Sequence, residues 1–338
     1  MTARRAGAAP PRGKLRVHVH NDPGDHPIFR VTPAHVRAAA RPFPGLLSRL
    51  AVTYSDDLAQ LQTALASAEV LLAGGVPADD LGRRAPRLRW IQSTNAGVEK
   101  LLPRVPPGVV LTNASGVHGP QAAEFAVTAL LMLHHRLPHF VMRQREARWD
   151  PAYSTPIAGR TVVVVGVGRI GSEVARLARR LGLRVIGVRR SGAPARFVDR
   201  MYRPRDLARV LPRADFVVVT TPLTAETHGL LGRRELDLLP RHAGLVNVGR
   251  AAVVDYDALA DKLRRGELGG AILDVFPEEP LPPESPLWST PNLVVVPHCG
   301  VDDAAAYVPR CLAIFFDNLR RYLGGRPLRN RVDPARGY

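Results

Sequence analysis

Residues 161–171 read TVVVVGVGRIG, a run of four valines that leads directly into a glycine-rich loop. An uninterrupted β-branched run is typical of a central strand of a parallel sheet, because helices cover both faces of such a strand. After the loop, apolar residues recur at helical spacing over residues 170–181. This stretch therefore predicts a strand, a turn and a helix in immediate succession.

The loop has the spacing G-x-G-x-x-G, with glycines at Gly166, Gly168 and Gly171. The first glycine permits a tight turn, the second lets the backbone approach a pyrophosphate, and the third lets the helix pack on the strand. The N-terminus of the helix attracts the phosphate. We therefore predict a dinucleotide-binding loop that includes Arg169 and Ile170; the alternative is a glycine-rich turn without a ligand.

Strands and helices alternate through the rest of the C-terminal half, which is typical of a parallel sheet with crossover helices. With the strand at 161–166, the expected strands make one doubly wound sheet of the Rossmann type. They lie at residues 183–188, 216–220, 245–248, 271–275 and 293–296, and the expected helices at 205–211, 233–239 and 256–265.

The first third of the chain alternates in the same way. A long apolar stretch at 121–136 predicts a buried helix that links two domains, and an amphipathic helix at 310–323 is expected to pack back on another domain. We predict a discontinuous domain of residues 1–118 and 303–338 and a dinucleotide-binding domain of residues 119–302. The expected strands of the first domain are 15–20, 51–54, 70–73 and 88–91, and its expected helices are 33–40 and 57–66.

The composition is that of a globular protein of about two domains, with 338 residues, 46% of them apolar and 23% charged. The formal net charge of +17 first suggests a polyanionic partner. The basic residues are nearly all arginines spread along the chain, without a stripe of basic and aromatic side chains. We expect no nucleic-acid partner, although nucleic-acid binding is kept as an alternative.

The cysteines and the apolar runs indicate the compartment. Two cysteines, Cys299 and Cys311, make neither a disulfide framework nor a zinc site by themselves. Residues 1–14 lack the apolar centre of a signal peptide, and no apolar run reaches the length of about 18 to 20 residues that a membrane span needs. The expected location is the cytoplasm, without a membrane partner.

Two features resemble reactive or metal-binding sites, and each has an ordinary structural explanation. His135 and His139 stand four residues apart, but Pro138 interrupts the helical spacing and no third ligand accompanies them. We therefore predict no metal site. Cys299 is either an oxidisable thiol or an inert packing residue, and the second interpretation is favoured.

The end of the second strand of the dinucleotide-binding domain indicates which dinucleotide binds. Sites that bind NAD commonly have a carboxylate there for the adenine ribose, whereas this chain has Arg189, Arg190 and Ser191. Two guanidinium groups and a hydroxyl can hold a 2′-phosphate by charge-assisted hydrogen bonds. We therefore predict NADP in preference to NAD; the alternative is that these are ordinary surface arginines.

Three later segments, 247–250, 273–280 and 296–300, carry polar residues at strand ends, where open α/β sheets bind ligands. An arginine, a carboxylate and a histidine that meet there can reduce a 2-oxo acid. The guanidinium holds the substrate carboxylate and polarises the ketone, and the imidazolium donates a proton as hydride arrives. A carboxylate beside the histidine favours its protonated form. Taken singly, each residue also has a structural explanation.

With these motifs the chain resembles the D-2-hydroxyacid dehydrogenase family over residues 15–338. The resemblance implies a smaller flavodoxin-like α/β substrate domain and a homodimer formed through the cofactor domain. It also implies that Arg250 binds the substrate, that His298 is the acid/base and that Glu279 is its partner. The other residues that it implies are Ala96 and Gly97, whose amides receive the substrate carboxylate, and Thr221, Pro222, Val248, Asp274 and Gly300, which contact the cofactor.

Residues 280–288 and 332–338 are similar to the glyoxylate/hydroxypyruvate reductase A branch of that family. Trp149 matches either a tryptophan of that branch near the substrate or an ordinary packing residue. The branch implies NADPH-dependent reduction of glyoxylate or hydroxypyruvate to the hydroxy acid. Two alternatives are kept: a non-catalytic relative that senses dinucleotides and recruits a protein, and an NAD-linked dehydrogenase with another substrate.

Overall fold

The computed structural model describes residues 13–76 and 80–338, so most of the N-terminal segment considered for a signal peptide lies outside the described residues. The chain forms two compact units. The discontinuous unit comprises Met1–Val117 and Asp303–Tyr338, and the continuous unit comprises His118–Asp302. The expected boundary at 118/119 differs from this division by one residue. Within the described residues, no helix combines the length and apolar character that a bilayer crossing requires.

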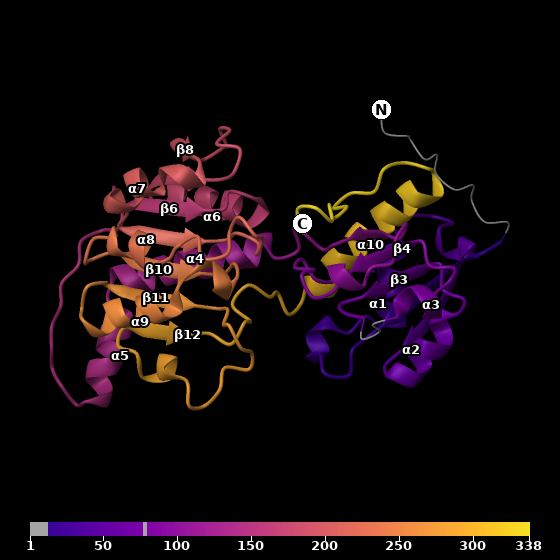
Figure 1. The fold of residues 1–338 in the computed structure, drawn as a ribbon, viewed down its shortest axis with the longest axis horizontal. Helices are drawn as coiled ribbons and strands as arrows, with labels where there is room; N and C mark the ends of the chain where they lie inside the picture. Colours follow the sequence, from indigo (N-terminus) through magenta and orange to yellow (C-terminus); the bar gives the residue numbers. More distant parts are fainter. Residues whose placement is uncertain (1–12, 77–79) are drawn as a thin grey trace. The chain divides into compact units, whose positions relative to one another are not determined.

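The discontinuous unit contains a parallel five-stranded sheet in the order β2-β1-β3-β4-β5, the strand order of flavodoxin-like folds. One face buries Trp90 against Phe315 and Phe316 of α10, the helix that returns to this unit from the end of the chain (Figure 1). The elements are β1 (Leu15–His20), η1 (Pro27–Phe29), α1 (Pro33–Ala40), η2 (Leu47–Arg49), β2 (Leu50–Ser55), α2 (Leu58–Leu65), β3 (Val70–Ala73), α3 (Leu81–Arg84), β4 (Trp90–Ser93), η3 (Leu102–Arg104), β5 (Val110–Thr112) and α10 (Tyr307–Leu323).

The continuous unit contains a parallel seven-stranded sheet in the order β12-β11-β10-β9-β6-β7-β8. From β6 the chain adds β7 and β8 on one side of the sheet, and it then returns to add β9 to β12 on the other side. The point between β6 and β9 is therefore the topological switch point, at which such sheets bind ligands. Its elements are α4 (Gly119–His134), α5 (Leu137–Arg145), β6 (Thr161–Val165), α6 (Arg169–Arg180), β7 (Arg184–Val188), β8 (Arg200–Tyr202), η4 (Pro204–Asp206), α7 (Leu207–Val210), η5 (Leu211–Arg213), β9 (Phe216–Val219), α8 (Arg233–Asp237), β10 (Gly244–Asn247), η6 (Ala251–Val253), α9 (Tyr256–Arg264), β11 (Gly270–Leu273), η7 (Pro286–Ser289) and β12 (Leu293–Val295).

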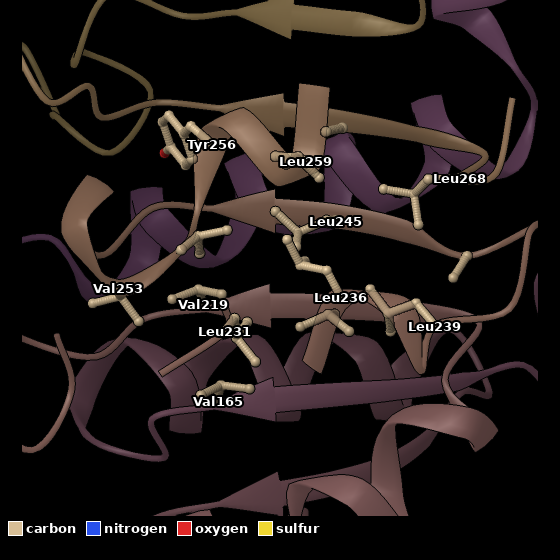
Figure 2. Packing of buried hydrophobic residues seen from close by; sticks show 14 of the residues in the cluster. Val165, Val219, Leu231, Leu236, Leu239, Leu245, Val253, Tyr256, Leu259 and Leu268 are labelled. Carbon is tan, nitrogen blue, oxygen red and sulfur yellow. The ribbon is translucent and has the colours of Figure 1, made fainter. Parts of the chain in front are cut away.

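The valine run of β6 is buried on both faces, which explains its composition. Val163 and Val165 join the core under α8 and α9, whereas Val162 and Val164 join the core under α4 and α6. Figure 2 shows Val165 pointing into the first of these cores, with side chains from the neighbouring strands. The prediction of a doubly wound α/β fold with a second, flavodoxin-like α/β domain is confirmed.

Several short elements of the described chain were not predicted, among them α3, the 3-10 helices, β5, β8 and α5. The strands β5 and β8 have three residues each, too few for a periodic pattern to appear. The helix α5 follows Arg136, whose φ of 55° ends α4. Pro138 lies in the first turn of α5, where its missing N–H would have no partner anyway, so a residue that suggested an interruption marks a helix start.

Candidate active site

The glycine-rich loop occupies the switch point at the end of β6. Gly166 has a φ of 104°, and a Cβ added to it would lie 2.8 Å from the backbone nitrogen of Thr221. A Cβ at Gly171 would lie 2.1 Å from the carbonyl oxygen of Gly166, so the start of α6 packs directly on the loop. A Cβ at Gly168 would meet nothing within 4 Å. The loop is therefore tightly packed at its two ends and open in its middle.

The end of β7 places Arg189, Arg190 and Ser191 in sequence after Val188. Nη2 of Arg189 donates to the carbonyl oxygens of Ala193 and Pro194, at 2.5 and 2.8 Å. Its Nε is buried and has no acceptor among the described residues. Arg190 and Ser191 are exposed, and Nη1 of Arg190 lies 4.0 Å from Oε2 of Glu226. A buried, unpartnered N–H beside an exposed guanidinium suits an anionic ligand.

Asp274 is fully buried just after β11. Its Oδ1 accepts hydrogen bonds from the backbone nitrogens of Cys299, at 3.0 Å, and Gly300, at 2.9 Å. Its Oδ2 is buried without a donor in the described part of the chain. Burial raises the pKa of this carboxyl group from 3.8 to about 6, although the two backbone hydrogen bonds oppose the shift. Asp274 therefore has one free acceptor position.

A second unpartnered group lies after β9. Thr221 is buried, and its Oγ1 has no hydrogen-bond partner among the described residues. The next residue, Pro222, is exposed, whereas Val248, which follows β10, is buried. Oγ1 of Thr221, Oδ2 of Asp274 and Nε of Arg189 are thus buried polar atoms that need a partner, and with the open Gly168 they fit a bound dinucleotide.

Glu279 and His298 form a close pair. Oε2 of Glu279 lies 2.7 Å from Nδ1 of His298, and Oε1 accepts a hydrogen bond of 2.8 Å from the backbone nitrogen of Phe276. Both side chains are partly exposed. His298 has a φ of 47°, and its backbone nitrogen donates to the carbonyl oxygen of Val296. The carboxylate therefore holds one ring nitrogen of an accessible histidine and leaves the other available.

Arg250 follows β10 in a turn that is held from beneath. Its side chain is partly exposed, and Nη1 donates to the carbonyl oxygen of Gly249 at 2.8 Å. Nδ2 of Asn247 donates to the carbonyl oxygen of Arg250 and to the hydroxyl of Tyr256. The Tyr256 hydroxyl in turn donates to the carbonyl oxygen of Val275 at 2.8 Å. This chain of hydrogen bonds ties the arginine turn to the segment after β11 that leads to Glu279.

Ala96 and Gly97 belong to the discontinuous unit and follow β4. Both are partly exposed, and the carbonyl oxygen of Ala96 accepts a hydrogen bond of 2.8 Å from Nδ2 of Asn113. The backbone nitrogen of Asn95 donates to Oγ of Ser93. The loop is thus fixed by its neighbours while the two small residues stay accessible.

The other candidate groups are placed as ordinary residues. His139 lies 3.3 Å from Asp150, and Nδ1 of His135 lies 2.8 Å from Oγ of Ser154. Within the described residues, no group of three or more His, Cys, Asp or Glu side chains is arranged to hold a metal ion. Cys299 is exposed. Partial desolvation of its sulfur and the nearby carboxylates of Asp274 and Asp302 raise the pKa of its thiol, which disfavours the reactive thiolate.

Comparison with known proteins shows the family of this chain. The family described as "D-isomer specific 2-hydroxyacid dehydrogenase, NAD binding domain" matches residues 127–300. The chain belongs to the D-isomer specific 2-hydroxyacid dehydrogenase family. It is therefore an NAD(P)-dependent oxidoreductase that interconverts 2-hydroxy and 2-oxo acids.

The relatives of this dehydrogenase include named reductases. It is 35% identical to a glyoxylate/hydroxypyruvate reductase B of Pectobacterium atrosepticum over 288 residues, which are 80% of this chain and 87% of the relative. Residues 280–288 and 332–338 resemble the A branch of the same family, whereas this relative is named as a B enzyme. A D-isomer specific 2-hydroxyacid dehydrogenase from Xanthobacter autotrophicus, solved with NADPH and MES, has 30% identity and a TM-score of 0.80, with 96% of this chain and 100% of that chain covered.

A second solved structure carries a narrower description. It is an NADPH-dependent glyoxylate/hydroxypyruvate reductase from Sinorhizobium meliloti in complex with NADP and sulfate. Its identity to this dehydrogenase is 29% and its TM-score is 0.80, with 96% of this chain and 100% of that chain covered.

Sequence reasoning missed the residues that support Arg250. Asn247 lies in the segment 247–250, which was expected at a strand end, but only the structure shows that its side chain donates to the hydroxyl of Tyr256. A tyrosine nine residues after an asparagine in a strand-to-helix segment carries no specific signal. The supporting network could not be recognised before the turn was known.

Proposed function

We propose that this dehydrogenase uses NADPH to reduce a small 2-oxo acid of the glyoxylate or hydroxypyruvate type to the 2-hydroxy acid, of D configuration where the product is chiral. The observation that carries the proposal is the Glu279–His298 pair, 2.7 Å apart and partly exposed. It follows β11 and β12, whereas the glycine loop follows β6 of the same parallel sheet. An acid/base group and a dinucleotide loop thus belong to the carboxyl edge of one sheet.

In the proposed reaction the protein binds the oxo acid and supplies the proton. The guanidinium of Arg250 holds the substrate and polarises its ketone, and the accessible Nε2 of His298 donates the proton to the ketone oxygen. Glu279 orients the imidazole and stabilises its protonated form. The backbone amides of Ala96 and Gly97 receive the substrate carboxylate.

The cofactor would be held by the unpartnered groups. The loop of Gly166, Gly168, Arg169, Ile170 and Gly171 would receive the pyrophosphate, and NADPH supplies the hydride when bound. Arg189, Arg190 and Ser191 would hold the 2′-phosphate, which supports NADP over NAD. Oδ2 of Asp274 would accept from the nicotinamide carboxamide. Thr221, Pro222, Val248 and Gly300 would line the cofactor site.

The experiment is a kinetic panel with the purified protein. NADPH or NADH is mixed with glyoxylate, hydroxypyruvate or pyruvate, and the loss of absorbance of the reduced cofactor is followed. We expect the highest kcat/KM with NADPH and one of the first two acids. Cofactor binding without turnover of any 2-oxo acid would instead favour the dinucleotide-sensing alternative.

We further propose that the protein is a homodimer formed through the continuous unit. Large apolar side chains are exposed along α5 and the segment after it, with Trp149 97%, Tyr153 90% and Val141 50% exposed. Apolar side chains gathered in one segment favour a protein partner. Light scattering at micromolar concentration tests this, with a Trp149→Glu variant expected to shift the mass toward the monomer.

A further inference from the structure

A polar cavity of about 170 Å³ lies in the discontinuous unit. It is lined by residues that follow three neighbouring strands, namely His20 at the end of β1, Gly74 after β3 and Thr94 after β4. The loop after β4 continues from Thr94 to Ala96 and Gly97, and Nδ2 of Asn95 donates to the carbonyl oxygen of Gly74 at 3.0 Å. The cavity therefore adjoins the loop whose amides are proposed to hold the substrate carboxylate.

The most unusual group in the cavity wall is His20. It is 3% exposed, and its Nε2 is buried without a partner among the described residues. Its Nδ1 lies 2.9 Å from Oγ of Ser55. The same oxygen lies 2.8 Å from Nε2 of His18, whose Nδ1 lies 2.8 Å from Oγ1 of Thr53. A buried ring nitrogen without a partner costs stability unless a ligand supplies one.

The hydrogen-bond chain allows Nε2 of His20 to be either a donor or an acceptor. Burial lowers the pKa of both His18 and His20, so both rings are neutral near pH 7. The single proton of the Ser55 hydroxyl can be donated to only one of the two rings. In one arrangement Nε2 of His20 is an acceptor, and in the other it carries the proton and donates.

Carboxylates outnumber the cation around the cavity. Asp22 and Asp25 line it together with Arg30, and Asp56 is also close enough to influence His20. The charge of Arg30 is already balanced by Asp56, since Nη2 of Arg30 lies 2.6 Å from Oδ2 of Asp56. Partial burial of the carboxyl group and the neighbouring Asp22 raise the pKa of Asp25, although the residue as a whole is exposed. A second negative charge on a ligand would therefore be repelled here, although the chain as a whole is strongly basic.

We propose that this cavity receives the distal end of the 2-oxo acid and selects substrates that carry an uncharged hydroxyl group there, with His20 as the specificity-determining residue. The proposal rests on the proposed function, because it places the substrate carboxylate on the Ala96–Gly97 amides. A hydroxyl group both donates and accepts, so it satisfies Nε2 of His20 in either proton arrangement. A carboxylate only accepts, and an alkyl tail leaves Nε2 without a partner.

The test compares substrates that differ only at the distal end. Hydroxypyruvate and 2-oxobutyrate have the same number of non-hydrogen atoms, with a hydroxyl in one replaced by a methyl in the other. Oxaloacetate adds a negative charge, and glyoxylate, which has no tail, is the reference for normalisation. We expect the wild-type kcat/KM for hydroxypyruvate to exceed that for 2-oxobutyrate by about tenfold or more, because only hydroxypyruvate can form a hydrogen bond with the buried Nε2 of His20.

Variants separate the hydroxyl preference from the charge preference. His20→Leu is expected to bring the hydroxypyruvate to 2-oxobutyrate ratio close to one, through KM more than kcat, and His20→Gln to recover part of it. Asp25 is exposed, so Asp25→Asn is expected to fold normally and to raise the relative kcat/KM for oxaloacetate several-fold. Glu284→Gln, which changes an exposed carboxylate of the other unit, is the matched control and leaves every ratio unchanged.

A binding measurement keeps the inference testable if the proposed function fails. Thermal shifts with D-glycerate and D-2-hydroxybutyrate are measured for the wild type and both His20 variants. A larger shift with D-glycerate, lost in His20→Leu, supports the cavity even where no turnover occurs. A wild-type preference near one, or the same preference in correctly folded His20→Leu protein, overturns it. Absence of turnover with every 2-oxo acid counts against the proposed function alone.

Discussion

The Glu279 carboxylate is held at both oxygens: Oε2 lies 2.7 Å from Nδ1 of His298, and Oε1 accepts a hydrogen bond from the backbone nitrogen of Phe276. A carboxylate fixed in this way cannot turn away from the imidazole without losing a second hydrogen bond. The imidazole is therefore held at Nδ1, and Nε2 lies on the other side of the ring.

Removing the charge of Glu279 tests this arrangement. In Glu279→Gln, the imidazole of His298 loses the charged acceptor that holds its Nδ1, so we expect kcat/KM for 2-oxo acid reduction to fall by about 10- to 100-fold. The measurement is the rate of NADPH oxidation at a fixed pH. The neighbouring exposed Glu278, changed to Gln, serves as the control, and undiminished turnover in Glu279→Gln contradicts the assignment.

Replacing His298 removes the proposed proton donor itself. His298→Ala is expected to lower kcat by about 100- to 10,000-fold, the usual range for an acid/base group. The dissociation constant of NADPH, measured by fluorescence titration, is expected to stay close to the wild-type value. Undiminished turnover in this variant would remove His298 from its role.

The same added methyl group is predicted to destabilise the fold at one glycine of the loop and not at another. In Gly171→Ala the Cβ would lie 2.1 Å from the carbonyl oxygen of Gly166, so α6 must move and we expect a loss of several °C in Tm. In Gly168→Ala the added Cβ meets nothing within 4 Å, so the Tm is expected to equal that of the wild type. NADPH affinity is expected to fall in both. Equal Tm losses would contradict this account.

The arginines after β7 are predicted to discriminate between the two dinucleotides. Arg189→Asp combined with Arg190→Ala is expected to weaken NADPH by about 10- to 100-fold, the value of one or two hydrogen bonds to a charged group. NADH should weaken far less, since it has no 2′-phosphate. Arg180→Ala, at the exposed end of α6, is the control. Equal losses for both cofactors would refute the phosphate site.

Asp274 is predicted to reduce folding stability at neutral pH. Its pKa is raised from 3.8 to about 6, chiefly by burial, so the folded protein holds this proton more tightly than the unfolded chain does. The stabilising effect of the proton is complete below about pH 4 and is lost as the pH rises through about 6. Asn is neutral at all these pH values, and its oxygen can accept the same two backbone hydrogen bonds.

Urea unfolding of the wild type and Asp274→Asn measures this effect. The stability of the variant relative to the wild type is expected to rise by about 2 kcal/mol between pH 4.5 and pH 7.5. NADPH binding should weaken, because the amide presents a donor where the carboxylate Oδ2 was an acceptor. Parallel pH profiles for the two proteins would contradict the buried charge.

The elements that sequence could predict are those with local patterns. The valine strand, the glycine loop and α6 follow from adjacent residues, and the return of α10 follows from the spacing of its apolar side chains. The helix α5 was missed because a local rule failed. A proline disrupts the interior of a helix but is favoured in the first turn, where Pro138 lies.

Contacts that depend on strand register could not be predicted. His18 and His20 lie two residues apart on β1, and Thr53 and Ser55 lie two residues apart on β2. Only the register that pairs His18 with Thr53 and His20 with Ser55 joins the four side chains in one network. Likewise, the 2.7 Å approach of Glu279 to His298 requires β11 and β12 to be neighbours. The residue types were evident in the sequence, whereas their adjacency is a property of the sheet.

The division of one unit into two chain segments affects the order in which the protein is completed during synthesis. The buried face around Trp90 needs Phe315 and Phe316 of α10, and these residues follow the whole of the continuous unit in the chain. The ribosome therefore synthesises every strand of the seven-stranded sheet before α10 can pack on the five-stranded sheet. Until α10 is synthesised, the apolar face of the five-stranded sheet is exposed to chaperones or to incorrect partners.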